Sequence, residues 1–139
     1  MAITQAMCSS FKEQLLLGEH DLDTNTIKIA LFTSAATLSA ATTAYSTSDE
    51  VVGTGYTAGG NTLTGAVVTL SGTTAFVDFT DTTWATATIT ARGALIYNSS
   101  QANKAIAVLD FGGDKTSTAG NFTVQFPAND ATNAIIRIA

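Results

Sequence analysis

The sequence predicts a mainly β fold, an antiparallel β-sandwich or barrel-like domain with one N-terminal amphipathic α-helix. Apolar and polar residues alternate along most of the segments that follow residue 26, which is the period of a strand with one buried face. β-Branched and aromatic residues are concentrated in these segments. The connections are short and polar, as in SSQAN at 99–103, and leave no room for a crossover helix, so the strands are expected to pair antiparallel.

The chain has 139 residues, which is close to the commonest size of a single domain and long enough to bury a hydrophobic core. We therefore expect one domain over 1–139, with the helix at 5–17 and the β-sandwich at 27–139. The segment 34–50 shows neither the alternation of a strand nor the three-to-four-residue spacing of a helix clearly. It is predicted to be a long surface loop with a short helical turn.

The N-terminal helix is predicted from apolar residues at helical spacing. Met7, Phe11 and Leu15 follow one another at intervals of four, two further leucines widen the stripe, and Gly18 stands where a helix-ending glycine is expected. The stripe can pack on the chain's own sheet or on a partner, and the first is the commoner use. Phe11 and Leu15 are therefore candidate partner contacts under the second alternative.

Seven segments have the alternation or the composition of strands. They are 27–32 (IKIALF), 66–70 (AVVTL), 75–79 (AFVDF), 83–98 (TWATATITARGALIYN), 104–111 (KAIAVLDF), 121–126 (NFTVQF) and 134–138 (AIIRI). Gly93 is expected to mark a break or bulge in the longest segment, because glycine inside a strand supplies no packing. Asp78 alternates with Val77 and Phe79, and it is therefore expected to face solvent.

A glycine-rich segment, GTGYTAGG at 53–60, satisfies the G-x-G-x-x-G/A pattern of dinucleotide-binding loops. That pattern binds a pyrophosphate only between a buried strand and the start of a helix, and a strand-like run follows the glycines here. We interpret these glycines as backbone devices that permit positive φ angles and irregular turns. The predicted fold-defining turn residues are Gly53, Gly55, Gly59 and Gly60, together with Gly112 and Gly113 of a second turn in DFGGD at 110–114.

Residues with metal-binding or catalytic potential are few. His20 is the only histidine, and contact with the end of the helix is sufficient to explain it. DLDTN at 21–25 begins like a calcium loop, but Thr26 replaces the glycine of the sharp turn and Phe32 the bidentate glutamate, so an Asx turn is expected. Cys8 is the only cysteine and is expected to be buried and unreactive. The sequence predicts no catalytic, cofactor-binding or metal site, and the protein is not expected to be an enzyme.

The charge distribution argues against two classes of partner. Eleven acidic and six basic residues give a net charge of −5, and the basic residues form no cluster, so binding to nucleic acid is not expected. No apolar run reaches the length that spans a bilayer, and the N-terminus has no signal-peptide pattern, so a protein without membrane association, made and kept inside a cell, is expected.

Three further residues are candidate partner contacts. Trp and Arg anchor interfaces more often than their abundance predicts, which points to Trp84 and Arg92. Tyr45 is the third. For Trp84, which lies on a predicted strand, a place in the core is the commoner alternative.

Four segments together resemble a group of small virion structural proteins of tailed bacteriophages, and the similarity extends over nearly the whole chain. The segments are FKEQLLLGEHDLDTNTIKIALFTSAATL at 11–38, EVVGTGYTAGGNTLTG at 50–65, TWATATITARGALIYN at 83–98 and AVLDFGGDKTSTAGNFTVQFP at 107–127.

The resemblance implies a non-enzymatic, β-rich protein without cofactors, most simply a capsid decoration (cement) protein. Such a protein is made in the cytoplasm of the bacterial host and ends on the capsid surface of the virion. Its partners are then the major capsid protein and copies of itself, as a dimer or trimer. Two alternatives remain open: a tail component such as a tube, fibre or adaptor, and a glycan-binding β-sandwich that uses Tyr45, Tyr56 and Trp84.

Overall fold

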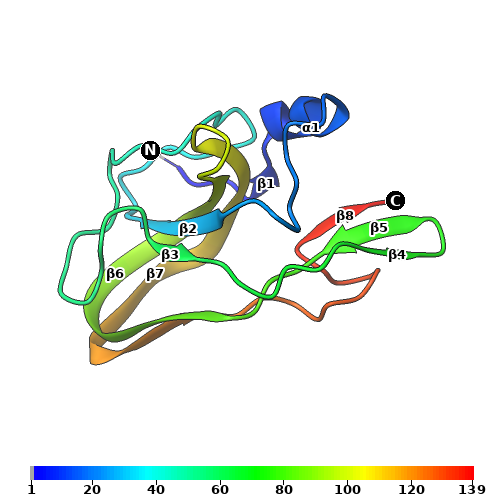
Figure 1. The fold of residues 1–139 in the computed structure, drawn as a ribbon. Coiled ribbons are helices and arrows are strands. Elements are labelled where there is room, and N and C mark those ends of the chain that lie inside the picture. Colours follow the sequence, from blue (N-terminus) through cyan, green and yellow to red (C-terminus); the bar gives the residue numbers. More distant parts are fainter. Residues whose placement is uncertain (1) are drawn as a thin grey trace.

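The fold is described by a computed structural model, which covers residues 2–139. In this range the chain forms two antiparallel β-sheets and one short helix near the N-terminus (Figure 1). The predicted class, mainly β with antiparallel pairing and an N-terminal helix, is therefore confirmed.

The larger sheet has five strands in the order β1-β7-β6-β2-β3. Two of them, β6 and β7, are much longer than the others and form a curved two-stranded ribbon along the molecule (Figure 1). The strands are β1 (Ala6–Met7), β2 (Ile27–Phe32), β3 (Asn61–Thr62), β6 (Thr82–Asn98) and β7 (Lys104–Val124).

The smaller sheet has three strands in the order β4-β5-β8 and carries the C-terminus. Its strands are β4 (Thr69–Ser71), β5 (Thr74–Val77) and β8 (Ile136–Ile138). In Figure 1 this sheet extends to one side of the larger sheet, at the end of the molecule where the helix lies. Its inner residues Val77 and Ile136 belong to the same hydrophobic core as Ile29 of β2 and Val108 of β7, so one core joins the two sheets.

The strand β7 corrects one prediction. We predicted two strands, 104–111 and 121–126, separated by a glycine turn in DFGGD, but β7 runs continuously through both. The register places Asp110 opposite Gly93 and Lys115 opposite Ala91, so the four residues 111–114 lie opposite the single residue Arg92. Gly112 has φ +81° in this irregular stretch. The expected irregularity near Gly93 therefore exists, but the extra residues belong to the partner strand and form a bulge rather than a turn.

The helix is shorter than predicted. It spans α1 (Ser9–Leu16) rather than 5–17, because the backbone of the preceding residues pairs with β7, Ala6 with Val108 and Met7 with Ala107. Phe11 is fully buried in the core and packs on the chain's own sheet, whereas Leu16 and Leu17 of the same predicted stripe are exposed. Cys8 is also fully buried, and burial raises the pKa of its thiol to about 11.

The segment 34–50 is irregular, as predicted; it contains hydrogen-bonded turns, such as the one from Ser39 to Thr42, but no helix. Single backbone bridges attach it to neighbouring segments, Leu38 to Ile3 and Ala44 to Lys104. At its end the carboxylate of Glu50 is buried. The bridge from Ala44 to Lys104 attaches the segment to β7 of the larger sheet.

Candidate interaction surface

One face of the smaller sheet is apolar over its whole width. Leu70 of β4 lies opposite Ala75 of β5, which lies opposite Ile138 of β8, and cross-strand partners share a face. The next row on this face holds Val77 and Ile136, which are buried in the core. The inner half of the face is therefore covered by the chain itself, whereas the outer half is not.

The outer half borders a groove of about 570 Å³ between this sheet and the end of the helix. Leu15 and Val68 contribute apolar groups to the groove, and Asp21 and Asp23 contribute carboxylates. We call the set of Leu15, Val68, Leu70, Ala75 and Ile138 the small-sheet surface.

Several side chains here are more exposed than is usual for their type. Leu70 is 72% exposed, Ile138 53% and Val68 51%, and on the adjoining end of the helix Leu16 is 92% exposed. Single exposed apolar residues are common, but a group of them on one sheet face is typical of a binding surface.

The predicted partner contacts occupy different environments. Phe11 and Trp84 are buried, at 0% and 4% exposure, and Trp84 packs on Tyr56 and on Phe122, with ring centroids 5.8 and 6.2 Å apart. Neither side chain is available to a partner in this conformation. Leu15 is half-buried in the groove.

The remaining two have partners within the chain. Arg92 forms an ion pair with Asp110 beside the bulge in β7. Tyr45 is half-buried and stacks on Tyr97, with ring centroids 4.5 Å apart. Of the five predicted contacts, only Leu15 belongs to the small-sheet surface.

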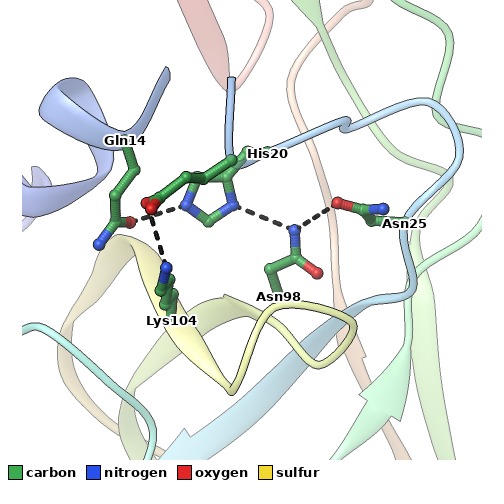
Figure 2. Close-up of polar contacts among 6 residues, drawn as sticks. Gln14, His20, Asn25, Asn98 and Lys104 are labelled. Atoms are coloured by element: carbon green, nitrogen blue, oxygen red, sulfur yellow. Dashed lines mark hydrogen bonds and ion pairs between the residues drawn. The ribbon is translucent and has the colours of Figure 1, made fainter. Parts of the chain in front are cut away.

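A polar cluster surrounds His20 (Figure 2), which is also one of the residues that line the groove. Nε2 of His20 lies 2.8 Å from the Gln14 side-chain oxygen, and Nδ1 lies 3.0 Å from the Asn98 amide nitrogen, which also donates to Asn25 at 2.9 Å. The ring packs edge-on against Phe11. The cluster joins the helix, the segment before β2 and the end of β6, so our expectation that His20 interacts with the helix terminus missed its main partners.

This geometry selects the neutral imidazole. Because the Asn98 amide donates, Nδ1 must accept, and the proton resides on Nε2 facing the Gln14 oxygen. Burial lowers the pKa of His20, the charge of Lys104 lowers it further, and the charge of Glu19 opposes both effects. Lys104 is itself paired with Glu19 at 3.1 Å. The arrangement serves packing and orientation and presents no free base to a substrate.

A second cluster surrounds Glu50. Its carboxylate accepts hydrogen bonds from the hydroxyls of Tyr45 and Tyr56, both at 2.7 Å, and from the amide of Gly59 at 2.8 Å. Tyr97 donates to the Gly59 carbonyl oxygen at 2.7 Å. Burial, followed by the neighbouring carboxylate, raises the pKa of all three tyrosines, that of Tyr97 to about 12.

The glycine-rich segment therefore does bind an anionic group, namely the chain's own Glu50. Gly55, Gly59 and Gly60 have positive φ angles, as predicted, whereas Gly53 does not. Gly53 is instead required by proximity, because a Cβ there would lie 2.5 Å from the Thr88 carbonyl oxygen. A phosphate cradle is not formed, since the amide that would face it is occupied and buried.

The segment DLDTN forms the expected Asx turn. The Asp21 side chain accepts from the amides of Asp23 and Thr24, and Asn25 accepts from the amide of Asp21. Hydrogen bonds from Thr24 and Asp23 lower the pKa of Asp21. Within residues 2–139, no group of three or more His, Cys, Asp or Glu side chains is placed to hold a metal ion.

Two other polar residues, Asp78 and Asn98, are buried in the structure. Asp78 was expected to face solvent, but β5 ends at Val77 and the Asp78 side chain turns inward, with 2% exposure. Asn98, the last residue of β6, is fully buried and joins His20 to Asn25. The helix in the described part of the chain is too short to cross a membrane.

Comparisons with protein-family models, with curated proteins and with solved structures each return no match.

Proposed function

We propose that this chain is a non-enzymatic structural protein of a tailed-bacteriophage virion, and within that class a capsid decoration protein. The small-sheet surface is the observation that carries the proposal, because it offers Leu70, Val68 and Ile138 to a partner on a domain whose core is otherwise covered. The resemblance of four segments to phage virion proteins supplies the class of partner.

The proposed protein would stabilise the shell by mass action. A protein that binds the assembled shell but not the opened shell loses its binding free energy whenever the shell opens, and this stabilises the shell. Apolar burial contributes roughly 25 cal/mol per Å² to such binding, before the cost of association. The major capsid protein is the proposed partner, and repetition on a symmetric lattice favours further copies of the chain as a dimer or trimer.

The glycan alternative receives no support from the geometry. Stacking on a sugar requires exposed aromatic faces, whereas Trp84 is buried and the hydroxyls of Tyr45 and Tyr56 are turned toward Glu50. No feature of residues 2–139 favours a tail location over the head, so the experiment has to separate these two.

Co-sedimentation tests the proposal. Purified protein is mixed with mature heads that lack it and, in parallel, with purified tails. We expect saturable binding to heads and none to tails. Binding to tails alone would contradict decoration of the head, and binding to neither would contradict the virion assignment.

Matched variants test the surface itself. Leu70→Asp and Ile138→Asp place charge on the small-sheet surface and are expected to weaken head binding at least tenfold. Val52→Asp is the control, since Val52 is 93% exposed but borders a different hollow, beside Thr88. Equal loss of binding in all three variants would exclude the small-sheet surface as the contact.

A further inference from the structure

The helix α1 is fixed differently at its two ends. At its start, backbone hydrogen bonds run from Cys8 to Ile106 and from Ser9 to Ala40, at 2.9 and 2.8 Å. The helix has eight residues and no side-chain cap at its start, and at its end Leu16 is 92% exposed. Isolated helices shorter than roughly 12 residues are marginal in water, so α1 depends on its contacts with the rest of the chain.

In the described part of the chain, two side-chain contacts connect residues 14–20 with the larger sheet (Figure 2). Nζ of Lys104 lies 3.1 Å from the carboxylate of Glu19, but this ion pair is partly exposed, and exposed pairs stabilise little. Nδ1 of His20 lies 3.0 Å from the amide nitrogen of Asn98, which is fully buried. Nε2 of the same ring faces Gln14 at 2.8 Å, so His20 is the buried polar connection between the last turn of the helix and the end of β6.

Backbone amides fix the orientation of the asparagine side chains at this contact. The side-chain oxygen of Asn98 accepts from the amide of Ser100 at 3.0 Å, and its nitrogen donates to the oxygen of Asn25 at 2.9 Å. The Asn25 oxygen is identified in turn, because it accepts from the amide of Asp21 at 3.1 Å. The group that faces Nδ1 of His20 is therefore a donor, and Nδ1 has to accept.

The charged groups around the ring oppose one another. They are Glu19 and Lys104 beside the ring, and Asp21 and Asp23, which line the groove with it. Burial lowers the pKa of His20, Lys104 lowers it further, and Glu19 raises it. The carboxylate of Asp21 is engaged by two backbone amides of its own Asx turn. The helix faces the ring with two neutral groups, the ring of Phe11 and the side-chain amide of Gln14.

We propose that the contact between His20 and Asn98 is a pH-sensitive latch, which holds the end of α1 on the larger sheet above about pH 6.5 and releases it in mild acid. A proton taken up from solvent by Nδ1 turns the acceptor into a donor, which then faces the donor of Asn98 in a buried site. The new positive charge also lies near Lys104. Only the partly exposed pair of Glu19 and Lys104 then remains as a polar connection, so we expect the end of the helix to open locally, before the whole chain unfolds.

Amide hydrogen exchange of the full chain, followed by NMR, tests the latch. The protection of the amides of residues 12–17 is compared with that of Leu95 and Ile96 in β6, which are fully buried, after correction for intrinsic exchange rates. Between about pH 7 and pH 5 we expect helix protection to fall by up to about 30-fold, since one proton favours the open form at most tenfold per pH unit below about 6.5. The β6 amides should stay at least about tenfold better protected at both pH values.

Two variants assign the effect to the imidazole. His20→Gln should lose the pH dependence of helix protection. Glu13→Gln, which neutralises an exposed carboxylate on the same helix, should respond as the wild type does. Equal protection of helix and β6 amides, helix protection that does not fall in acid, or the same fall in His20→Gln would each overturn the proposal.

The imidazole itself gives a test that needs no variant. His20 is the only histidine, so its ¹⁵N signals are unambiguous. At about pH 7 we expect a proton on Nε2 and none on Nδ1, and a proton on Nδ1 would overturn the latch. Leu15 and His20 line the groove, so release changes one wall of it. No partner takes part in these measurements, so their outcome is independent of the proposed function.

Discussion

At the scale of single residues, His20 shows how a buried network fixes a protonation state. Nδ1 faces an amide that donates, and that amide is also committed to Asn25. A proton on Nδ1 would place two donors face to face in a buried site. The folded state therefore holds the imidazole neutral.

This arrangement predicts a loss of stability in mild acid. The imidazole of the unfolded chain titrates near 6.5, and the folded pKa is lower. The unfolded state consequently binds more protons below about pH 6.5, so the stabilisation is complete above that pH and is lost as the pH falls through the folded pKa. We expect the free energy of unfolding, measured with urea, to decrease between about pH 6.5 and pH 5, before most carboxylates titrate.

His20→Gln separates this effect from other titrations. The variant should lose about 1–3 kcal/mol at about pH 7, because buried partners lose their hydrogen bonds, and its stability should vary less between about pH 6.5 and pH 5. The raised pKa of Asp78 acts in the opposite direction but is common to both proteins. A pH dependence equal to that of the wild type would show that His20 is not the group responsible.

The hydrogen bonds of Glu50 predict an order of stability loss for two substitutions. Glu50→Gln replaces one acceptor oxygen with a donor, which must then face a hydroxyl or an amide that also donates, and we expect a loss of about 1–3 kcal/mol. Tyr45→Phe removes one donor and leaves the carboxylate with two, so the loss should be nearer to about 1 kcal/mol. Urea titrations of both variants would check the order, and a reversed order would show that the carboxylate is not the centre of the cluster.

At the scale of elements, glycine is required for two different reasons. At some positions a Cβ would collide with a neighbouring strand, and at others only the positive φ angle disfavours another residue. Gly60 and Gly112 both have positive φ angles, +74° and +81°. A Cβ at Gly60 would lie 1.8 Å from the Ile29 carbonyl oxygen, whereas a Cβ at Gly112 would meet nothing within 4 Å.

Alanine at these two positions should therefore differ in effect. Both variants incur the left-handed backbone cost of roughly 1–2 kcal/mol, but only Gly60→Ala must also displace strand β2, so we expect it to lose about 3 kcal/mol or more or to fail to fold. Thermal unfolding of the pair measures the steric contribution. Similar midpoints would contradict the close approach of the glycine segment to β2.

The two halves of the apolar face on the smaller sheet should also differ. Val77→Ala creates a cavity in the core and is expected to cost about 1–3 kcal/mol. Leu70→Ala, on the same face, should change stability by no more than about 0.5 kcal/mol, because Leu70 is 72% exposed. A large loss for Leu70→Ala in urea unfolding would mean that the outer half already has a partner, such as a second copy.

Much of this architecture is predictable from sequence, because strands with one buried face carry a local period. The strands at 27–32 and 82–98 were found almost to the residue. The errors arise where the secondary structure of a segment depends on pairing with a strand that is distant in the sequence. Met7 leaves the helix because β7 offers it a pairing partner, and the DFGGD segment continues as strand because β6 runs beside it.

The candidate sites were less predictable for the same reason. His20 depends on Asn98, which lies 78 positions away, and the inward turn of Asp78 follows from the early end of β5. Exposure of Leu70 depends on which part of an apolar face the chain leaves uncovered, and the alternation of a strand does not encode this.

At the scale of the whole molecule, the two sheets have different roles. The larger sheet and the helix enclose most of the core, whereas the smaller sheet joins that core through its inner half and leaves its outer half free. The proposed role uses this division, since a rigid domain can present an apolar face without losing stability. A net charge of −5 helps to keep such a protein dispersed before it meets its partner.

The most direct test of the decoration role is the heat resistance of phage heads. Heads that lack the protein are heated with and without a saturating amount of it, and the temperature at which packaged DNA is released is recorded with a DNA-binding dye. We expect release at a higher temperature when the protein is present, and no increase with Leu70→Asp. An unchanged or lower release temperature, at a concentration where binding is saturated, would contradict a stabilising role on the capsid.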